Sequence, residues 1–140
     1  MTNLDDLLCT AEQENIFVVD MQIKRNDVPA MSVCDDEGDC IIAIDSRKIK
    51  NNSDCKVKTA HELGHCIKGA FYNRYSNLDI ISKHEYQADK WAVQRLMPSD
   101  EFLSAIRNGC VEIWELAEYF DVTEDFVRRA CEIYRAMGIL

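Results

Sequence analysis

Two histidines and a glutamate in the middle of the chain have the spacing of a metal-dependent hydrolase motif. Residues 61–65 read His-Glu-Leu-Gly-His, an instance of the H-E-x-x-H pattern. Residues i and i+4 of a helix lie on one face, so the imidazoles of His61 and His65 can bind one metal ion. Glu62 lies about 100° round the helix, where it can accept a proton from a zinc-bound water of pKa about 7. The pattern predicts a hydrolytic zinc site with Glu62 as its catalytic base.

A catalytic zinc also needs a third protein ligand and an open position for water. His84, Glu85 and Asp89 are the candidates, in the segment that follows. Glu85 and Asp89 are four residues apart and share one helix face, whereas His84 points about 100° away from Glu85. We expect Glu85 to be the third ligand and Asp89 to accept the N–H of a ligating histidine, which fixes the orientation of that ring. His84 and Asp89 remain alternatives for the third ligand.

Two further questions about this site stay open at the level of sequence. A surface helix that carries two histidines by chance is the alternative interpretation of residues 61–65, although these are two of only three histidines in the chain. A metallopeptidase also needs a hydrogen-bond donor for the oxyanion besides zinc. Tyr72, Tyr75 and Tyr86 lie near the motif, and the sequence does not select among them.

Three short apolar segments in the first third of the chain predict β-strands. They are residues 16–19, 30–34 and 40–45, of which the last, Cys-Ile-Ile-Ala-Ile-Asp, is the clearest. An acidic turn that contains Gly38 separates the second strand from the third. We therefore expect a small, mostly antiparallel sheet in the N-terminal half.

Helical spacing of apolar residues and capping residues predict the rest of the fold. Helices are expected at residues 3–14, 53–68, 83–97, from 99 onward, at 111–119 and at 124–137. The helix with the histidines should begin at an N-cap, Ser53, and end near Gly69. Ala60 and Gly64 lack bulk, which would let another element approach it closely. The fold class is α+β: a small N-terminal sheet packed with a metal-binding helix pair, followed by a helical C-terminal tail.

The tail, residues 111–137, has the pattern of a helix-turn-helix, which taken alone suggests DNA binding. Its charges oppose that function. Residues 111–127 hold no Lys or Arg and six acids: Glu112, Glu115, Glu118, Asp121, Glu124 and Asp125. Such a recognition helix would meet phosphates with the wrong sign. We expect the two helices, the second capped by Thr123, to pack on the protein core or form a substrate surface.

Length, charge and cysteine content limit the remaining possibilities. A chain of 140 residues without linker or repeat predicts one domain over residues 1–140. The net charge of -9 argues against nucleic acid as the main partner and suits a basic protein. No secretory signal or membrane-length apolar run is present, which predicts a soluble cytoplasmic protein. The seven cysteines include no CxxC pair and are expected to be reduced.

Three segments together resemble the ImmA/IrrE family of metallopeptidases. They are His-Glu-Leu-Gly-His at 61–65, the stretch Glu-Tyr-Gln-Ala-Asp-Lys-Trp-Ala at 85–92, and Leu-Met-Pro at 96–98. The family shows the same first motif, then a Glu-x-x-Ala-Asn-x-Phe-Ala-like helix that closes in Leu-Met-Pro, and the resemblance covers most of the chain. Asp89 stands where Asn is common and Trp91 where Phe is common. An Asp there is similar to the Glu-x-x-x-Asp pattern of other gluzincins, in keeping with a place beside a ligating histidine.

The resemblance implies a cytoplasmic zinc protease, of a kind often encoded by phages and mobile elements. Members of that family cleave a helix-turn-helix repressor and so switch transcription on. The leading hypothesis is thus a zinc endopeptidase that acts on a repressor-like protein, with no membrane or direct nucleic-acid partner. A zinc-stabilised protein-binding module without proteolysis is the alternative. A DNA-binding regulator that uses the tail is disfavoured by charge.

Overall fold

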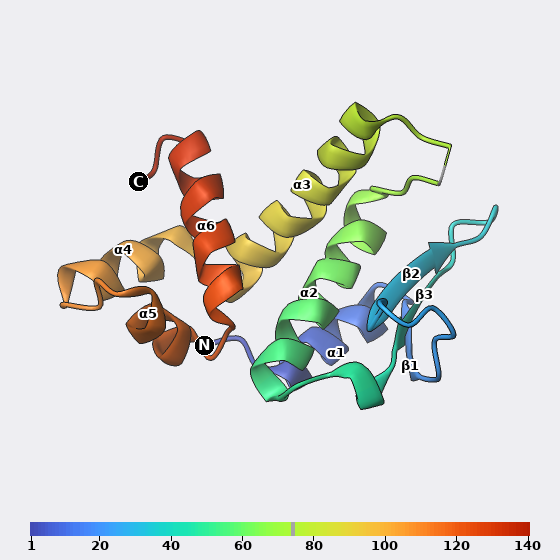
Figure 1. The fold of residues 1–140 in the computed structure, drawn as a ribbon, viewed down its shortest axis with the longest axis horizontal. Coiled ribbons are helices and arrows are strands. Elements are labelled where there is room, and N and C mark those ends of the chain that lie inside the picture. The colour runs from blue at the N-terminus through green and yellow to red at the C-terminus, as the bar shows by residue number, and fades with distance from the viewer. Residues whose placement is uncertain (74) are drawn as a thin grey trace.

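The computed structural model describes residues 1–73 and 75–140 and has an α+β architecture, which confirms the predicted fold class. In Figure 1 the sheet, α1 and α2 lie at one side, α4, α5 and α6 at the other, and α3 runs between the two groups. The elements within the described residues are α1 (Leu4–Gln13), β1 (Phe17–Asp20), β2 (Ala30–Cys34), β3 (Cys40–Ile44), the 3-10 helix η1 (Ser46–Lys48), α2 (Asn52–Lys68), α3 (Leu78–Leu96), α4 (Ser99–Arg107), α5 (Ile113–Phe120) and α6 (Glu124–Ala136).

The sheet has the strand order β1-β3-β2, and its edge strand β2 packs against α2, the helix with the two histidines. β2 and β3 form an antiparallel hairpin in which Cys34 lies opposite Cys40. The turn is closed by Asp35, whose carboxylate accepts two backbone N–H groups at 2.9 Å each. β1 pairs with β3 in parallel, because the chain reverses in residues 21–29 and β3 then enters between the two earlier strands. The sheet is therefore mixed, with one antiparallel and one parallel pairing, and not mostly antiparallel as expected, because β3 lies beside a strand that runs in its own direction.

Helix α2 carries the two histidines and ends where the sequence predicts, but it begins at a different cap. The side chain of Asn51 accepts the N–H of Asp54 at 2.8 Å and is the N-cap. Ser53 is already inside the helix, and the prediction that it caps α2 is wrong because an Asn two residues earlier does so equally well. Gly69 ends the helix in the left-handed region, with φ of 60°.

Helix α3 is longer than expected. It starts at Leu78, where the side chain of Asn77 accepts the N–H of Ile80 at 2.9 Å. The first turn lies in solvent, with Leu78 80% exposed, so it lacks the apolar periodicity that marks the rest of the helix. The helix ends at Leu96, just before Pro98, as predicted.

Helices α2 and α3 approach each other closely at small residues. Ala60, Ala88 and Ala92 are fully buried. A Cβ on Gly64 would lie 2.5 Å from the carbonyl oxygen of Ala88 and 2.9 Å from its Cα. Only glycine fits at that position of α2, and the expectation that Ala60 and Gly64 admit a neighbouring element is confirmed.

The C-terminal helices share one apolar core with the rest of the chain. Buried side chains from α1, the sheet, α2 and α3 contact those of α4 to α6, including Leu7, Ile42, Leu63, Phe102 and Tyr134. The hydroxyl of Tyr134 donates to the backbone carbonyl of Met97 at 2.6 Å, which ties α6 to the end of α3. Thr123 caps α6 as predicted, accepting the N–H of Phe126 at 3.2 Å. Among the described residues, no helix combines the length and the apolar character needed to cross a bilayer.

Candidate metal centre

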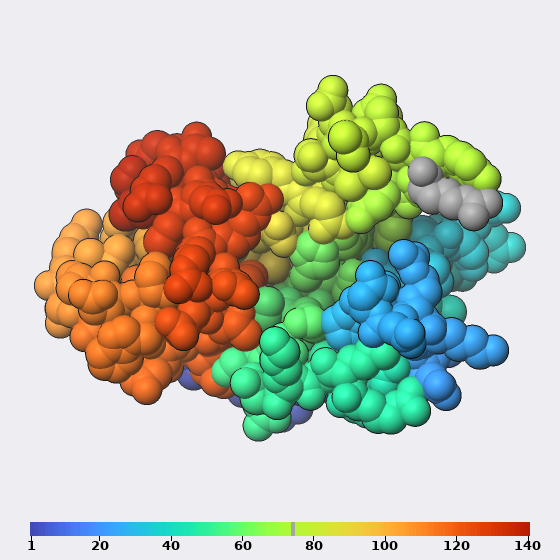
Figure 2. Space-filling view, viewed as in Figure 1, coloured from blue at the N-terminus to red at the C-terminus, as the bar shows by residue number. Residues whose placement is uncertain are grey.

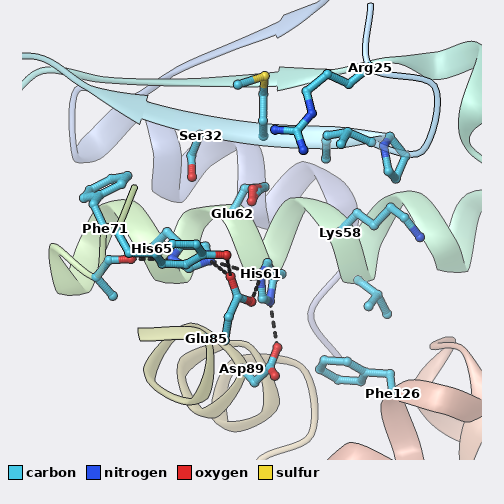
Figure 3. Close-up of a pocket in the computed structure, with 17 residues that line it drawn as sticks. Arg25, Ser32, Lys58, His61, Glu62, His65, Phe71, Glu85, Asp89 and Phe126 are labelled. Atoms are coloured by element: carbon cyan, nitrogen blue, oxygen red, sulfur yellow. Dashed lines mark hydrogen bonds and ion pairs between the residues drawn. The ribbon is translucent and has the colours of Figure 1, made fainter. Parts of the chain in front are cut away.

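Three side chains from two helices converge on one point. In Figure 3, His61 and His65 of α2 and Glu85 of α3 point toward each other. The two Nε2 atoms are 3.1 Å apart. Glu85 Oε2 is 2.9 Å from His61 Nε2, and Glu85 Oε1 is 3.2 Å from His65 Nε2. These three residues form a group whose donor atoms all lie within 4.8 Å of one another.

Each histidine is oriented through the nitrogen that faces away from this point. The Nδ1 of His61 bonds to Asp89 Oδ1 at 2.7 Å, and the Nδ1 of His65 bonds to the backbone carbonyl of Ala70 at 2.5 Å. An acceptor at Nδ1 fixes the proton there, so that Nε2 presents a lone pair. Asp89 thus occupies the place expected of it, beside a histidine of the group.

The donor set and its geometry fit a zinc ion. Zinc sites of hydrolases use two histidines and a glutamate, with bonds of about 2.0–2.2 Å, which in a tetrahedron separate the ligand atoms by about 3.3–3.6 Å. The two Nε2 atoms are 3.1 Å apart, and each has one of the two Glu85 carboxylate oxygens at 2.9 or 3.2 Å, so the three side chains are already close to the spacing that a shared metal ion requires. These atoms come from two different helices, and Glu85 follows His61 by 24 residues in the sequence.

The charges around the group favour a cation. Burial lowers the pKa of His61, but its hydrogen bonds to Asp89 and Glu85 outweigh burial and raise that pKa to about 10. Burial raises the pKa of Glu85, yet its bonds to His61, His65 and Tyr72 bring it well below the ordinary range. The carboxylates of Asp89 and Glu85 therefore favour a positive charge at this point.

Glu62 lies beside the three converging side chains and not among them. It is 7% exposed, and Figure 3 shows its carboxylate on the cavity side of α2. Its Oε2 atom is buried and has no hydrogen-bond partner within the described residues. Burial raises its pKa above the ordinary value, against the pull of the two imidazoles. A buried carboxyl group with a raised pKa and one oxygen free of hydrogen bonds in the described structure is suited to accept and release a proton.

A cavity of about 520 Å³ opens in front of the group. Residues 28–32, which lead into and form most of β2, line one wall, and α2, α3 and Phe126 of α6 line the others. In Figure 2 it is the hollow in the middle of the face, bordered by α6, α3 and residues 21–29. Tyr72 also lines it, and its hydroxyl donates to Glu85 Oε1 at 2.5 Å.

The structure separates the remaining candidates. His84 does not join the group, and its Nδ1 is buried without a partner in the described part of the chain. Of the three tyrosines, Tyr72 alone lines this cavity. Tyr86 packs against the core, and Tyr75 is 80% exposed.

Some residues of the site carry no signal in the sequence. Ala70 contributes a backbone carbonyl, which any residue could supply. Arg129 of α6 donates to Asp89 Oδ2 at 2.8 Å from a position 40 residues away. Its contact depends on how α6 packs against α3, which only the fold reveals.

Two histidines on one helix, a glutamate on the next and a second glutamate beside them are the residue types found in the zinc centres of metallopeptidases. A family model described as the IrrE N-terminal-like domain, from a family of peptidases, matches residues 11–132. The chain belongs to this family, and the resemblance drawn from its motifs is confirmed. No curated protein and no solved structure matches the chain.

Proposed function

We propose that this protein is a zinc-dependent endopeptidase, with His61, His65 and Glu85 as metal ligands and Glu62 as the catalytic base. The observation that carries the proposal is the convergence of the three donor side chains at the floor of an open cavity, with a buried carboxyl beside them. Membership of a peptidase family supports the same chemistry.

In the proposed hydrolysis, Glu62 transfers protons and Tyr72 stabilises the oxyanion. When bound, zinc supplies a Lewis acid that polarises a carbonyl and acidifies water. Glu62 takes the proton of the attacking water and carries it to the leaving amine, for which its raised pKa is suited. Tyr72, whose hydroxyl points to the group of ligands, donates to the oxyanion that develops on the scissile carbonyl.

A Glu62→Gln variant tests the catalytic step separately from metal binding. Gln has nearly the same shape and cannot take the proton, so the variant should bind zinc as the wild type does and lose peptide cleavage by at least about 100-fold. Asp54→Asn is a matched control, since Asp54 is a buried carboxylate of the same helix outside the cavity. Cleavage retained by Glu62→Gln would refute this role, and intact zinc binding without cleavage in the wild type would favour a zinc-stabilised binding module.

We further propose that the substrate is a helix-turn-helix repressor and that residues 1–140 act as one cytoplasmic domain. The substrate class is supported by the resemblance to the ImmA/IrrE family and by the net charge of -9, which complements a basic DNA-binding protein. The test is incubation of the zinc-loaded protein with a purified helix-turn-helix repressor, the first choice being one encoded by a neighbouring gene. One cut that is absent with Glu62→Gln supports the proposal, and a repressor that stays intact contradicts it.

A further inference from the structure

Asp89 is held from both sides by residues of different helices. Its Oδ1 bonds to His61 Nδ1 at 2.7 Å, and its Oδ2 accepts Nε–H of Arg129 at 2.8 Å. The contacts form an unbroken chain from the C-terminal helix α6, through α3, to a proposed zinc ligand on α2. Figure 3 shows the contact between Asp89 and His61.

The guanidinium of Arg129 is fixed by more than its contact with Asp89. Its Nη1 donates to Glu132 Oε2 at 3.0 Å, one turn further along α6. Its central carbon lies 5.7 Å from the ring centroid of Tyr86, which is close enough for a cation–π contact. The side chain is only 34% exposed. Three separate contacts thus leave it little freedom, and a planar donor fixed in this way restricts the rotation of the carboxylate it binds.

We infer that Arg129 is a positioning residue of the metal site, because it holds Asp89 in the orientation that aligns His61. Zinc affinity then depends on how α6 packs against α3. The inference rests on the proposed zinc site. A carboxylate with one oxygen on a ligating histidine and the other free can turn away from the ring, whereas one held at both oxygens cannot. Partners of this kind change metal affinity by about 10- to 100-fold in other zinc sites.

The sign of the effect separates this role from simple electrostatics. A positive charge near the site repels a dication, so removal of the guanidinium would, by charge alone, strengthen zinc binding. If Arg129 positions Asp89, its removal weakens zinc binding instead. Zinc affinity therefore reports the positioning role directly and without any substrate.

The experiment is a zinc titration of purified full-length variants, in competition with a chromophoric chelator. Arg129→Ala should weaken zinc binding by about tenfold, and Arg129→Lys should recover part of that loss because an ammonium can still donate to Asp89. Arg128→Ala is the matched control: it removes the same charge from the adjacent residue, which pairs with Asp125 and not with Asp89 in the described part of the chain, and it should bind zinc as the wild type does. Melting of the metal-free proteins checks that each variant is folded.

A double-mutant cycle tests whether Arg129 acts through Asp89. Asp89→Ala should weaken zinc binding by about 10- to 100-fold, and adding Arg129→Ala to it should cause no further loss. Losses that multiply would overturn the inference, as would Arg129→Ala binding zinc as tightly as Arg128→Ala or more tightly. A wild type that binds no zinc would overturn the proposed function as well, so the two failures are distinguishable.

Discussion

Replacement of Gly64 by alanine tests whether the close contact between α2 and α3 sets the geometry of the proposed metal site. Gly64 lies one residue before His65, and Ala88 lies one residue before Asp89. A Cβ at Gly64 would be 2.5 Å from the carbonyl oxygen of Ala88, about 0.9 Å short of the ordinary contact distance of 3.4 Å. The obstructing atoms are backbone, so the added methyl group must push the helices apart.

We expect a moderate cost in stability and a large cost in metal binding. Overpacking of this kind destabilises by about 1–3 kcal/mol, and the better helix propensity of alanine offsets about 1 kcal/mol of that. Metal–ligand distances in well-formed sites lie within about 0.2 Å of their usual values, whereas the added Cβ is about 0.9 Å closer to Ala88 than an ordinary contact allows. Gly64→Ala should thus lose at most about 2 kcal/mol of unfolding free energy and weaken zinc binding by about 10- to 100-fold.

The assay combines thermal melting of the metal-free protein with zinc titration. Gly109→Ala is the control, because Gly109 has φ of 103° and no described atom within 4 Å of an added Cβ. That variant is strained by its backbone and should lose about 1–2 kcal/mol while binding zinc normally. If Gly64→Ala binds zinc as tightly as Gly109→Ala, the contact between α2 and α3 does not position the ligands.

Three further predictions concern acid stability, a buried lysine and the cavity tyrosine. Hydrogen bonds from the Arg47 side chain and from backbone N–H groups lower the pKa of Asp45 to about 2. The stability that ionised Asp45 contributes is therefore complete above about pH 4 and is lost as the pH falls toward 2, so Asp45→Asn should lose the pH dependence of stability between pH 4 and pH 2 in an acid-unfolding experiment. Lys56 is 2% exposed and donates to the carbonyl of Phe120 at 2.8 Å, so Lys56→Met should cost about 1–3 kcal/mol in a urea melt, and an unchanged midpoint would contradict this. Tyr72→Phe should lower kcat by about 10- to 1000-fold with zinc retained, whereas an unchanged kcat would exclude Tyr72 as the oxyanion donor.

The core of the candidate site could be predicted because its residues obey local spacing rules. Helical periodicity alone places His61 beside His65, and Glu85 on the same face as Asp89. The small size of Gly64 also indicates a close approach of another element, since two helices can come close together only where a small residue lies between them. That the two pairs face each other follows from the packing of α2 on α3, which the resemblance to a known family supplied before the structure did.

The parts that could not be predicted depend on long-range packing or on backbone atoms. Arg129 reaches Asp89 only because α6 folds back against α3, and its position in a helix-turn-helix-like segment gives no hint of that contact. The carbonyl of Ala70 has no side-chain signature. The parallel pairing of β1 with β3 arises because a later strand enters between two earlier ones, and strand periodicity does not encode that order.

The measurement that tests the account most directly is the zinc content of the purified protein and three variants. His61→Ala and Glu85→Ala each remove one member of the converging group, and His84→Ala removes the histidine next to Glu85 that lies outside it. The account predicts about one zinc per chain in the wild type and in His84→Ala, and almost none in the other two. A wild type that takes up no zinc when supplied with it, or a Glu85→Ala variant that keeps its zinc, would contradict the assignment of this site.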